Sequence, residues 1–226
     1  MNIGEIQMKV VDYFGPKIAR DKLTAEETSM LFDICCQADE PYNHRLVGYI
    51  KEEVGITEGL RNSTLYRIIL NKMKKYLTTI DSGIWTQVVE SEIDFDLFDL
   101  KSAWYNKQIA MEFNPLHDHR DSADLVCVIF PKIDLDKSVD SYYINNSKEK
   151  QTGQLSFVFS ERSKNDFGLS QITVQPEEGD IFIFPATLGH YTTPVLGNSV
   201  RYSVSCNFTF SNLSKRFLSK LGTNED

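Results

Sequence analysis

Two of the chain's four histidines, His117 and His119, are separated by one residue and precede an apolar run. Side chains at positions i and i+2 of a β-strand lie on the same side, so both imidazoles are expected to face one way and Asp118 the other. Imidazole is the commonest metal ligand among side chains, and ligands must converge from one side. The pair therefore predicts part of a metal site. The same rule allows a second pair, His119 with Asp121.

A third ligand is expected from His190, within the stretch PEEGDIFIFPATLGHYTTP. PEEGD predicts a turn, IFIF predicts a buried strand, and Pro185 is expected to end that strand, with His190 in the bend that follows. Two histidines with one carboxylate and open positions form the facial triad of non-haem iron(II) oxygenases. Three of the four histidines thus fall into one hypothetical site.

Polar and apolar residues alternate in the stretch SVRYSVSCNF. Arg201, Ser203, Ser205 and Asn207 are expected on one face, and Val200, Tyr202, Val204 and Cys206 on the other. An arginine and a serine on the same face can together hold a carboxylate, because guanidinium offers a planar fork of donors and serine adds a hydroxyl.

The first third of the chain predicts helices that act as a scaffold. Thr24 and Glu27 form a capping-box pattern at the start of 23–37. Apolar residues recur at helical spacing in 43–56 and again in 63–80, so both segments are predicted to be helical.

From about residue 84 the segments become short, aromatic and β-branched. Strands are predicted at 102–113, 124–133, 153–160, 170–176, 179–186 and 199–210. This spacing is typical of an all-β barrel or sandwich. We expect residues 1–83 to form a helical scaffold packed on a β core of residues 84–226, the two together forming one structural domain. Residues 132–153 are polar and are expected to form a long loop over one mouth of the barrel.

Composition restricts the class of protein. The chain has 226 residues, 41% of them hydrophobic, and a net charge of −8, which disfavours a broad nucleic-acid-binding surface. The first residues show no signal peptide, and no apolar run approaches the length of a membrane span. The four cysteines lack metal-site spacing, so we expect reduced thiols in a cytoplasmic protein. A small-molecule or peptide substrate is expected, and a homodimer is an open alternative.

Together these motifs resemble the iron(II)/2-oxoglutarate-dependent dioxygenase family, over roughly residues 100–212. A distant histidine is followed 11 residues later by Arg-x-Ser, here His190 and Arg201-Tyr202-Ser203. The resemblance is strongest to a bacterial and phage branch of hydroxylases related in their core to the prolyl hydroxylases. A Trp…Asn-Pro…His-x-His segment opens the site in that branch, and it matches Trp104, Asn114, Pro115, His117 and His119.

The resemblance implies a double-stranded β-helix (jelly-roll) core with flanking helices. It implies iron(II) as metal, 2-oxoglutarate as cosubstrate held by Arg201 and Ser203, and O2 as oxidant. The expected reaction is hydroxylation of a C–H bond with release of succinate and CO2. No catalytic side chain is expected beyond the metal site, because the hard chemistry belongs to the metal and cosubstrate.

The sequence departs from the family pattern where His119 replaces the usual carboxylate. Two assignments of the metal ligands are open. In the one we favour, the metal is bound by His117, His119 and His190. In the other, it is bound by His119, Asp121 and His190, and His117 contacts these ligands without binding the metal. A three-histidine site is also found in cupin-type thiol dioxygenases, which use no 2-oxoglutarate. The alternatives are therefore a cupin-type three-histidine dioxygenase or a jelly-roll module that binds a ligand without turning it over.

Overall fold

The computed structural model describes residues 9–11, 15–80, 97–139, 152–159 and 170–211. The helices are α1 (Ala25–Gln37), η1 (Asn43–Arg45, a 3₁₀ turn), α2 (Thr57–Arg61) and α3 (Thr64–Ile80). The strands of the larger sheet are β1 (Lys9–Val11), β2 (Ile18–Lys22), β3 (Glu40–Pro41), β4 (Glu52–Gly55), β5 (Phe98–Gln108), β6 (Leu125–Asp134), β9 (Asp180–Pro185) and β11 (Val200–Phe210). The smaller sheet contains β7 (Leu155–Val158), β8 (Gln171–Val174) and β10 (Gly189–Thr192).

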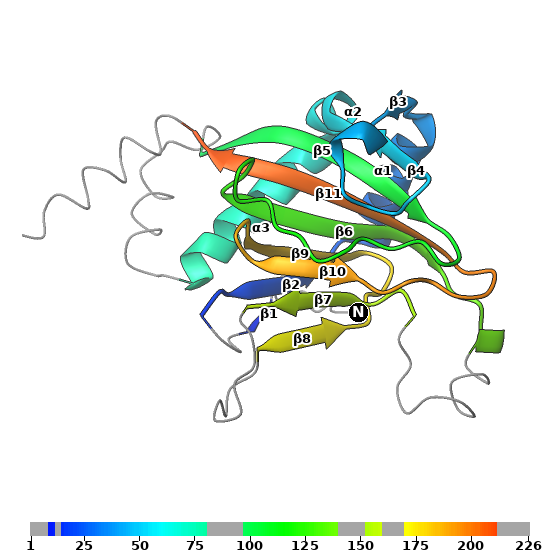
Figure 1. The fold of residues 1–226 in the computed structure, drawn as a ribbon. Helices are drawn as coiled ribbons and strands as arrows, with labels where there is room; N and C mark the ends of the chain where they lie inside the picture. Colours follow the sequence, from blue (N-terminus) through cyan, green and yellow to red (C-terminus); the bar gives the residue numbers. More distant parts are fainter. Residues whose placement is uncertain (1–8, 12–14, 81–96, 140–151, 160–169, 212–226) are drawn as a thin grey trace, which may run out of the picture.

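Two antiparallel sheets form the body of the protein (Figure 1). The larger sheet has the order β1-β2-β9-β6-β11-β5-β4-β3, and the smaller one β10-β7-β8. Neighbouring strands in space are far apart in the sequence, as where β9 lies between β2 and β6. The predicted class, mainly β with helices before the core, is confirmed.

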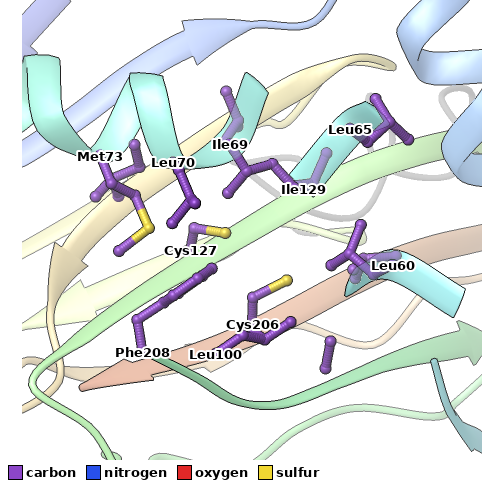
Figure 2. Packing of buried hydrophobic residues seen from close by; sticks show 14 of the residues in the cluster. Leu60, Leu65, Ile69, Leu70, Met73, Leu100, Cys127, Ile129, Cys206 and Phe208 are labelled. Atoms are coloured by element: carbon purple, nitrogen blue, oxygen red, sulfur yellow. The ribbon is translucent and has the colours of Figure 1, made fainter. Parts of the chain in front are cut away.

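The helices cover one face of the larger sheet. Apolar residues of α2 and α3 contact the inward residues of β5, β6 and β11, as Figure 2 shows for Met73, Cys127 and Cys206. All three are fully buried. Burying a large apolar side chain contributes roughly 1.5–3 kcal/mol, so this layer fixes the sheet from behind. Cys127 and Cys206 stand opposite each other on β6 and β11 as free thiols.

The smaller sheet faces the opposite side of the larger one. Phe157 of β7 packs against Phe182 and Phe184 of β9 at ring-centroid distances of 6.2 and 5.0 Å. Because side chains alternate along β9, Ile181 and Ile183 contact the helices while Phe182 and Phe184 contact the smaller sheet. The two sheets therefore enclose a space that the helices do not reach.

The predicted helix caps are confirmed at α1. The Thr24 hydroxyl accepts a hydrogen bond from Glu27 N at 3.2 Å, and the Glu27 carboxylate accepts one from Thr24 N at 2.8 Å. This reciprocal pair satisfies two backbone donors that the first turn leaves free. The helix predicted over 63–80 is also confirmed, as α3.

The helix predicted over 43–56 is wrong. This segment forms the short turn η1 and then strand β4, which pairs with β5. Gly48 and Gly55 weaken a helix there. Strands β1 to β4 also add the N-terminal region to the larger sheet, so that region is more than a helical scaffold, and the boundary at 83/84 stays a prediction.

The loop predicted over 132–153 is only partly described by the structure. Residues 132–134 belong to β6 rather than to a loop, and 140–151 lie outside the described residues.

Within the part of the chain that the structure describes, every helix is too short or too polar to cross a membrane.

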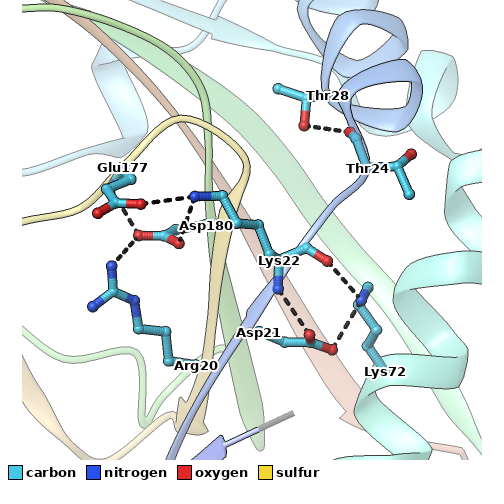
Figure 3. Close-up of polar contacts among 8 residues, drawn as sticks. All are labelled: Arg20, Asp21, Lys22, Thr24, Thr28, Lys72, Glu177 and Asp180. Carbon is cyan, nitrogen blue, oxygen red and sulfur yellow. Dashed lines mark hydrogen bonds and ion pairs between the residues drawn. The ribbon is translucent and has the colours of Figure 1, made fainter. Parts of the chain in front are cut away.

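A group of ion pairs ties β2 to β9 and α3 (Figure 3). Arg20 donates to the Asp180 carboxylate at 2.6 Å, and Lys72 of α3 donates to Asp21 at 2.9 Å. Lys22 reaches Glu177 at 2.8 Å. We call Arg20, Asp21, Lys22, Lys72, Glu177 and Asp180 the edge network.

Candidate metal centre

Backbone hydrogen bonds join the two histidine segments. His117 N donates to His190 O at 3.0 Å, and His190 N donates to His117 O at 2.9 Å. His119 N donates to Ala186 O at 2.8 Å. His117 and His119 thus lie in an extended segment that forms an isolated bridge, not in a regular strand, and His190 lies on β10 rather than in a bend. The predicted strand at His117 and His119 and the predicted bend at His190 are therefore corrected. The side chains of His117 and His119 still face the same space.

The three imidazoles converge. Their ligand atoms all lie within 4.8 Å of one another, and the Nε2 atoms of His119 and His190 are 3.3 Å apart. Nδ1 of His117 is 2.7 Å from Pro115 O, and Nδ1 of His190 is 3.0 Å from Leu188 O. A ring that donates from Nδ1 to a carbonyl presents the lone pair of Nε2 to its surroundings. This is the orientation that a metal requires.

Burial keeps the three rings neutral. Desolvation lowers the pKa of His190 to about 3 and that of His119 to about 4, and the neighbouring rings lower both further. The pKa of His117 is also lowered, mainly by burial. Only a neutral imidazole can donate a lone pair to a metal, so all three are in the ligand-competent form at neutral pH.

The carboxylates near the histidines lie outside the cluster of potential metal ligands. Asp118 pairs with Arg120 at 2.5 Å, and that pair lowers the pKa of Asp118. Asp121 is exposed and is outside the cluster of potential ligands. Among the described residues, the structure therefore brings His117, His119 and His190 together and leaves Asp121 apart. That these three residues bind the metal remains a prediction.

Arg201 lies on β11, on the face that looks toward the smaller sheet. Its side chain is fully buried, and one amino group donates to Gly153 O at 2.8 Å while the other donates to Gln108 Oε1. Its Nε has no hydrogen-bond partner. Its guanidinium carbon lies 5.2 Å from the ring centre of Phe130. Burial lowers the pKa of Arg201 to about 9, so the side chain is still charged at neutral pH.

No acidic side chain of the described residues pairs with Arg201. A buried charge without a counter-ion is unfavourable, so an anionic group is expected to complete this position. Ser203 lies two residues along the same face, is nearly fully buried, and accepts a hydrogen bond from Asn106 at 3.4 Å. The predicted alternation of a polar and an apolar face on β11 is confirmed, because Val204 and Cys206 belong to the helix-side core.

One cavity of about 260 Å³ contains both groups. It is lined by the three histidines, by Arg201 and Ser203, and by residues of β4 and β5. The residues present therefore fit a metal ion at the histidines and a carboxylate-bearing cosubstrate at Arg201. Trp104, which the resemblance placed at the opening of the site, lines this cavity and lies 6.0 Å from His119 between ring centres.

Sequence reasoning missed the contribution of residues 42–53 to this cavity. Tyr42, Val47 and Glu53 line it. Val47 and Glu53 fall within the helix predicted over 43–56, although Gly48 and the β-branched Val54 and Ile56 favour an extended segment.

Comparisons with known proteins agree with this geometry. Residues 102–207 match the model of a protein family described as "Putative 2OG-Fe(II) oxygenase". A prolyl-4-hydroxylase from Pseudomonas putida is 15% identical, with a TM-score of 0.50 over 86% of this chain and 92% of that one. The α-ketoglutarate-dependent epimerase SnoN of nogalamycin biosynthesis is 11% identical, with a TM-score of 0.51 over 84% and 76% of the two chains. No curated protein matches the sequence.

These likenesses bear on the fold and on the family that the chain resembles. At such low identities the two solved structures establish the fold alone, which is that of the double-stranded β-helix oxygenases. The family match covers β5 to β11 and includes all the candidate ligands. The resemblance to the iron(II)/2-oxoglutarate oxygenase family is therefore confirmed, and so is the predicted jelly-roll fold.

Proposed function

We propose that this protein is an iron(II)- and 2-oxoglutarate-dependent oxygenase that hydroxylates a C–H bond of its substrate, with release of succinate and CO2. His117, His119 and His190 would hold the iron, and Arg201 with Ser203 would bind the distal carboxylate of 2-oxoglutarate. The metal and the cosubstrate would supply the activation of O2.

The observation that carries this proposal is that one cavity holds both a cluster of three imidazoles and a buried guanidinium. Three neutral imidazoles converge on one point, and the buried guanidinium of Arg201 forms no ion pair with an acidic side chain of the described residues. 2-Oxoglutarate supplies donors for a metal at one end and a carboxylate at the other. A ligand that binds only a metal leaves the charge of Arg201 uncompensated.

The residues around the histidines favour a rigid site. The carbonyls of Pro115 and Leu188 hold the rings of His117 and His190 by their Nδ1 atoms. Phe184 packs edge-on against His190 at 4.9 Å between ring centres. Fixed second contacts of this kind hold a ligand's orientation and limit the access of water.

A second candidate is a three-histidine dioxygenase that uses no 2-oxoglutarate. The absence of a carboxylate from the histidine cluster, among the described residues, favours it. In that candidate, Arg201 would have to bind an anionic group of the prime substrate instead of 2-oxoglutarate.

The test is to mix anaerobic protein with iron(II), add 2-oxoglutarate, and record the visible absorption spectrum. A metal-to-ligand charge-transfer band is expected, because the cosubstrate would chelate the iron through its carboxylate and keto oxygens. Iron binding without a band would support the three-histidine dioxygenase. Absence of iron binding would leave a jelly-roll binding module.

Two variants locate the binding residues. His190→Ala is expected to abolish iron binding and hence the band, whereas His44→Ala, an exposed histidine on η1, should leave both unchanged. The substrate class, a small molecule or a peptide, and the cytoplasmic location remain predictions.

A further inference from the structure

Glu53 is a buried carboxylate that the proposed reaction does not use. It lies on β4, is 1% exposed, and lines the same cavity as the histidines. Its Oε2 accepts a hydrogen bond from Asn43 at 3.2 Å, and its Oε1 has no partner. Among the described residues, none with a positive charge forms an ion pair with it.

A second unsatisfied acceptor stands directly across the strand pair. Glu53 of β4 pairs in register with Asn106 of β5, and directly paired residues carry their side chains on the same face, about 5 Å apart. Asn106 is 2% exposed and lines the cavity. Its Nδ2 donates to Ser203, while its Oδ1 has no partner. The pair thus presents two oxygen atoms without a hydrogen-bond partner.

A third acceptor flanks the same position. A Cβ built on Gly48 would collide with both Glu53 Oε1 and Asn114 Oδ1, so these two oxygens lie close to the same point beside Gly48. Asn114 also lines the cavity. We call Glu53, Asn106 and Asn114 the acceptor pocket.

Unsatisfied buried acceptors are unfavourable, at roughly 1–3 kcal/mol each. An occupant that satisfies the unpartnered oxygens of Glu53 and Asn106 and also contacts Asn114 must carry several hydrogen-bond donors on one small group. The carboxylate favours an occupant of positive charge, because a charge-assisted hydrogen bond is about twice as strong as a neutral one. Burial, and secondarily Glu112, raise the pKa of Glu53 to about 7, as expected for a carboxylate that lacks its counter-ion.

The remaining lining suits the rest of such a molecule. The rings of Tyr42 and Trp104 stack at 5.7 Å between centres and offer an apolar wall. Arg201 is assigned to the carboxylate of 2-oxoglutarate in the proposed function, so its charge would be compensated there. Arg45, the other cation of the lining, is exposed and lies 5.1 Å from the ring centre of Tyr42.

We propose that the acceptor pocket binds a cationic N–H group, an ammonium or a guanidinium, of the prime substrate. This deepens the proposed function and rests on it for the reaction, because it places a basic substrate in the cavity that would hold the iron and 2-oxoglutarate.

Binding of n-butylammonium and n-butylguanidinium tests the proposal, with n-butanol as the neutral probe. Affinities are measured by calorimetry on the anaerobic protein loaded with iron(II) and 2-oxoglutarate, and on the protein alone. We expect both cations to bind at least about tenfold more tightly than butanol, the strength of one charge-assisted hydrogen bond. Carbon NMR should show the pKa of Glu53 falling when a cation binds.

Two variants and a matched control locate the effect. Glu53→Gln should weaken cation binding about tenfold and leave butanol unchanged. Gly48→Ala keeps the charge but fills the space between Glu53 and Asn114, and it should weaken both cations. Glu52→Gln is the control, because Glu52 is the preceding residue and pairs with Lys107 at 2.9 Å. It should bind as the unchanged protein does.

Equal binding of cations and butanol, no cation binding, or cation binding untouched by both Glu53→Gln and Gly48→Ala would each overturn the proposal. The charge-transfer band is recorded on the same samples. If the band is absent while Glu53-dependent cation binding persists, the proposed reaction fails and the acceptor pocket stands. If the band forms without cation binding, the reaction stands and the acceptor pocket fails.

Discussion

Two buried polar regions of this protein differ in how their charges are satisfied. In the edge network, the side chains of Asp21 and Asp180 are each 4% exposed and each pairs with a cation. Asp180 also accepts a hydrogen bond from Glu177 N at 2.7 Å. In the cavity, Arg201 and Glu53 are as deeply buried, yet neither has an ion-pair partner among the described residues.

The difference separates buried charged groups that stabilise the fold from buried charged groups that are available to bind a ligand. A buried polar atom is normally satisfied within the protein, so each exception requires an explanation. In the edge network, protein partners satisfy the carboxylates. The exceptions among the described residues gather in the cavity, at Glu53, Asn106, Arg201 and Asn207, with only Gln175 elsewhere. Changes in the two regions should therefore have opposite signatures on stability and binding.

The largest effect is expected at the histidines. His117→Ala should lower the affinity for iron(II) by at least about 100-fold, because loss of a second contact alone can cost 10–100-fold. Asp121→Ala should leave the affinity unchanged, since Asp121 is exposed and apart from the cluster. Anaerobic iron titration measures both. The reverse pattern would establish the His119, Asp121 and His190 assignment instead.

The next effect is expected at Arg201. Arg201→Met should weaken 2-oxoglutarate binding by about 100-fold and spare iron binding, because a bidentate charged contact is lost. The free energy of unfolding of the ligand-free protein should change by less than about 1 kcal/mol, since two lost hydrogen bonds are offset by removal of an unpaired buried cation. Calorimetric titration and urea unfolding measure the two quantities. A large loss of stability would show that Arg201 serves folding.

The sequence was sufficient to predict that several side chains of the cavity lie together. Strict alternation placed Arg201 and Ser203 on one face of β11 and Cys206 on the other, because a buried strand with two different environments carries a period of two. Spacing likewise grouped His117, His119 and His190. The local sequence pattern was enough to predict the position of a side chain wherever that position depends on a single strand.

The acceptor pocket could not be predicted from the sequence, for a physical reason. Leu46, Val47, Ile50 and Val54 fall at spacings that also suit one face of a helix. The segment forms strand β4 because it pairs with β5, and β5 is far from β4 in the sequence. Strand β10 was missed because four residues carry too little pattern.

A pH effect should separate Glu53 from ordinary carboxylates. Its pKa is raised to about 7 in the folded protein from an ordinary value of 4.5, so the folded state holds the proton more tightly. Stability is therefore fully present below about pH 4.5 and falls by roughly 2–3 kcal/mol as the pH rises through 7. Urea unfolding from pH 5 to 8 measures this. Glu53→Gln should flatten that decline and Glu52→Gln should not, and an equal decline in both variants would contradict the assignment.

The smallest effect is expected in the edge network and concerns stability alone. Asp180→Ala removes the acceptor for Arg20 and for Glu177 N, which should lower the free energy of unfolding by about 1.5 kcal/mol. The loss is moderate because Arg20 is partly exposed and regains water. Asp99→Ala is the matched control, since that carboxylate is 56% exposed and lies 3.9 Å from Lys101. It should change stability by less than about 0.5 kcal/mol.

Iron and 2-oxoglutarate affinities should be unchanged in Asp180→Ala, because its partners lie outside the cavity lining. Urea unfolding and anaerobic titration of the same preparations measure both properties. If Asp180→Ala weakened ligand binding while leaving stability intact, the division between a network for folding and a cavity for ligands would be wrong. A loss of stability alone would show that a buried carboxylate whose partners come from the protein itself acts on the fold and not on the site.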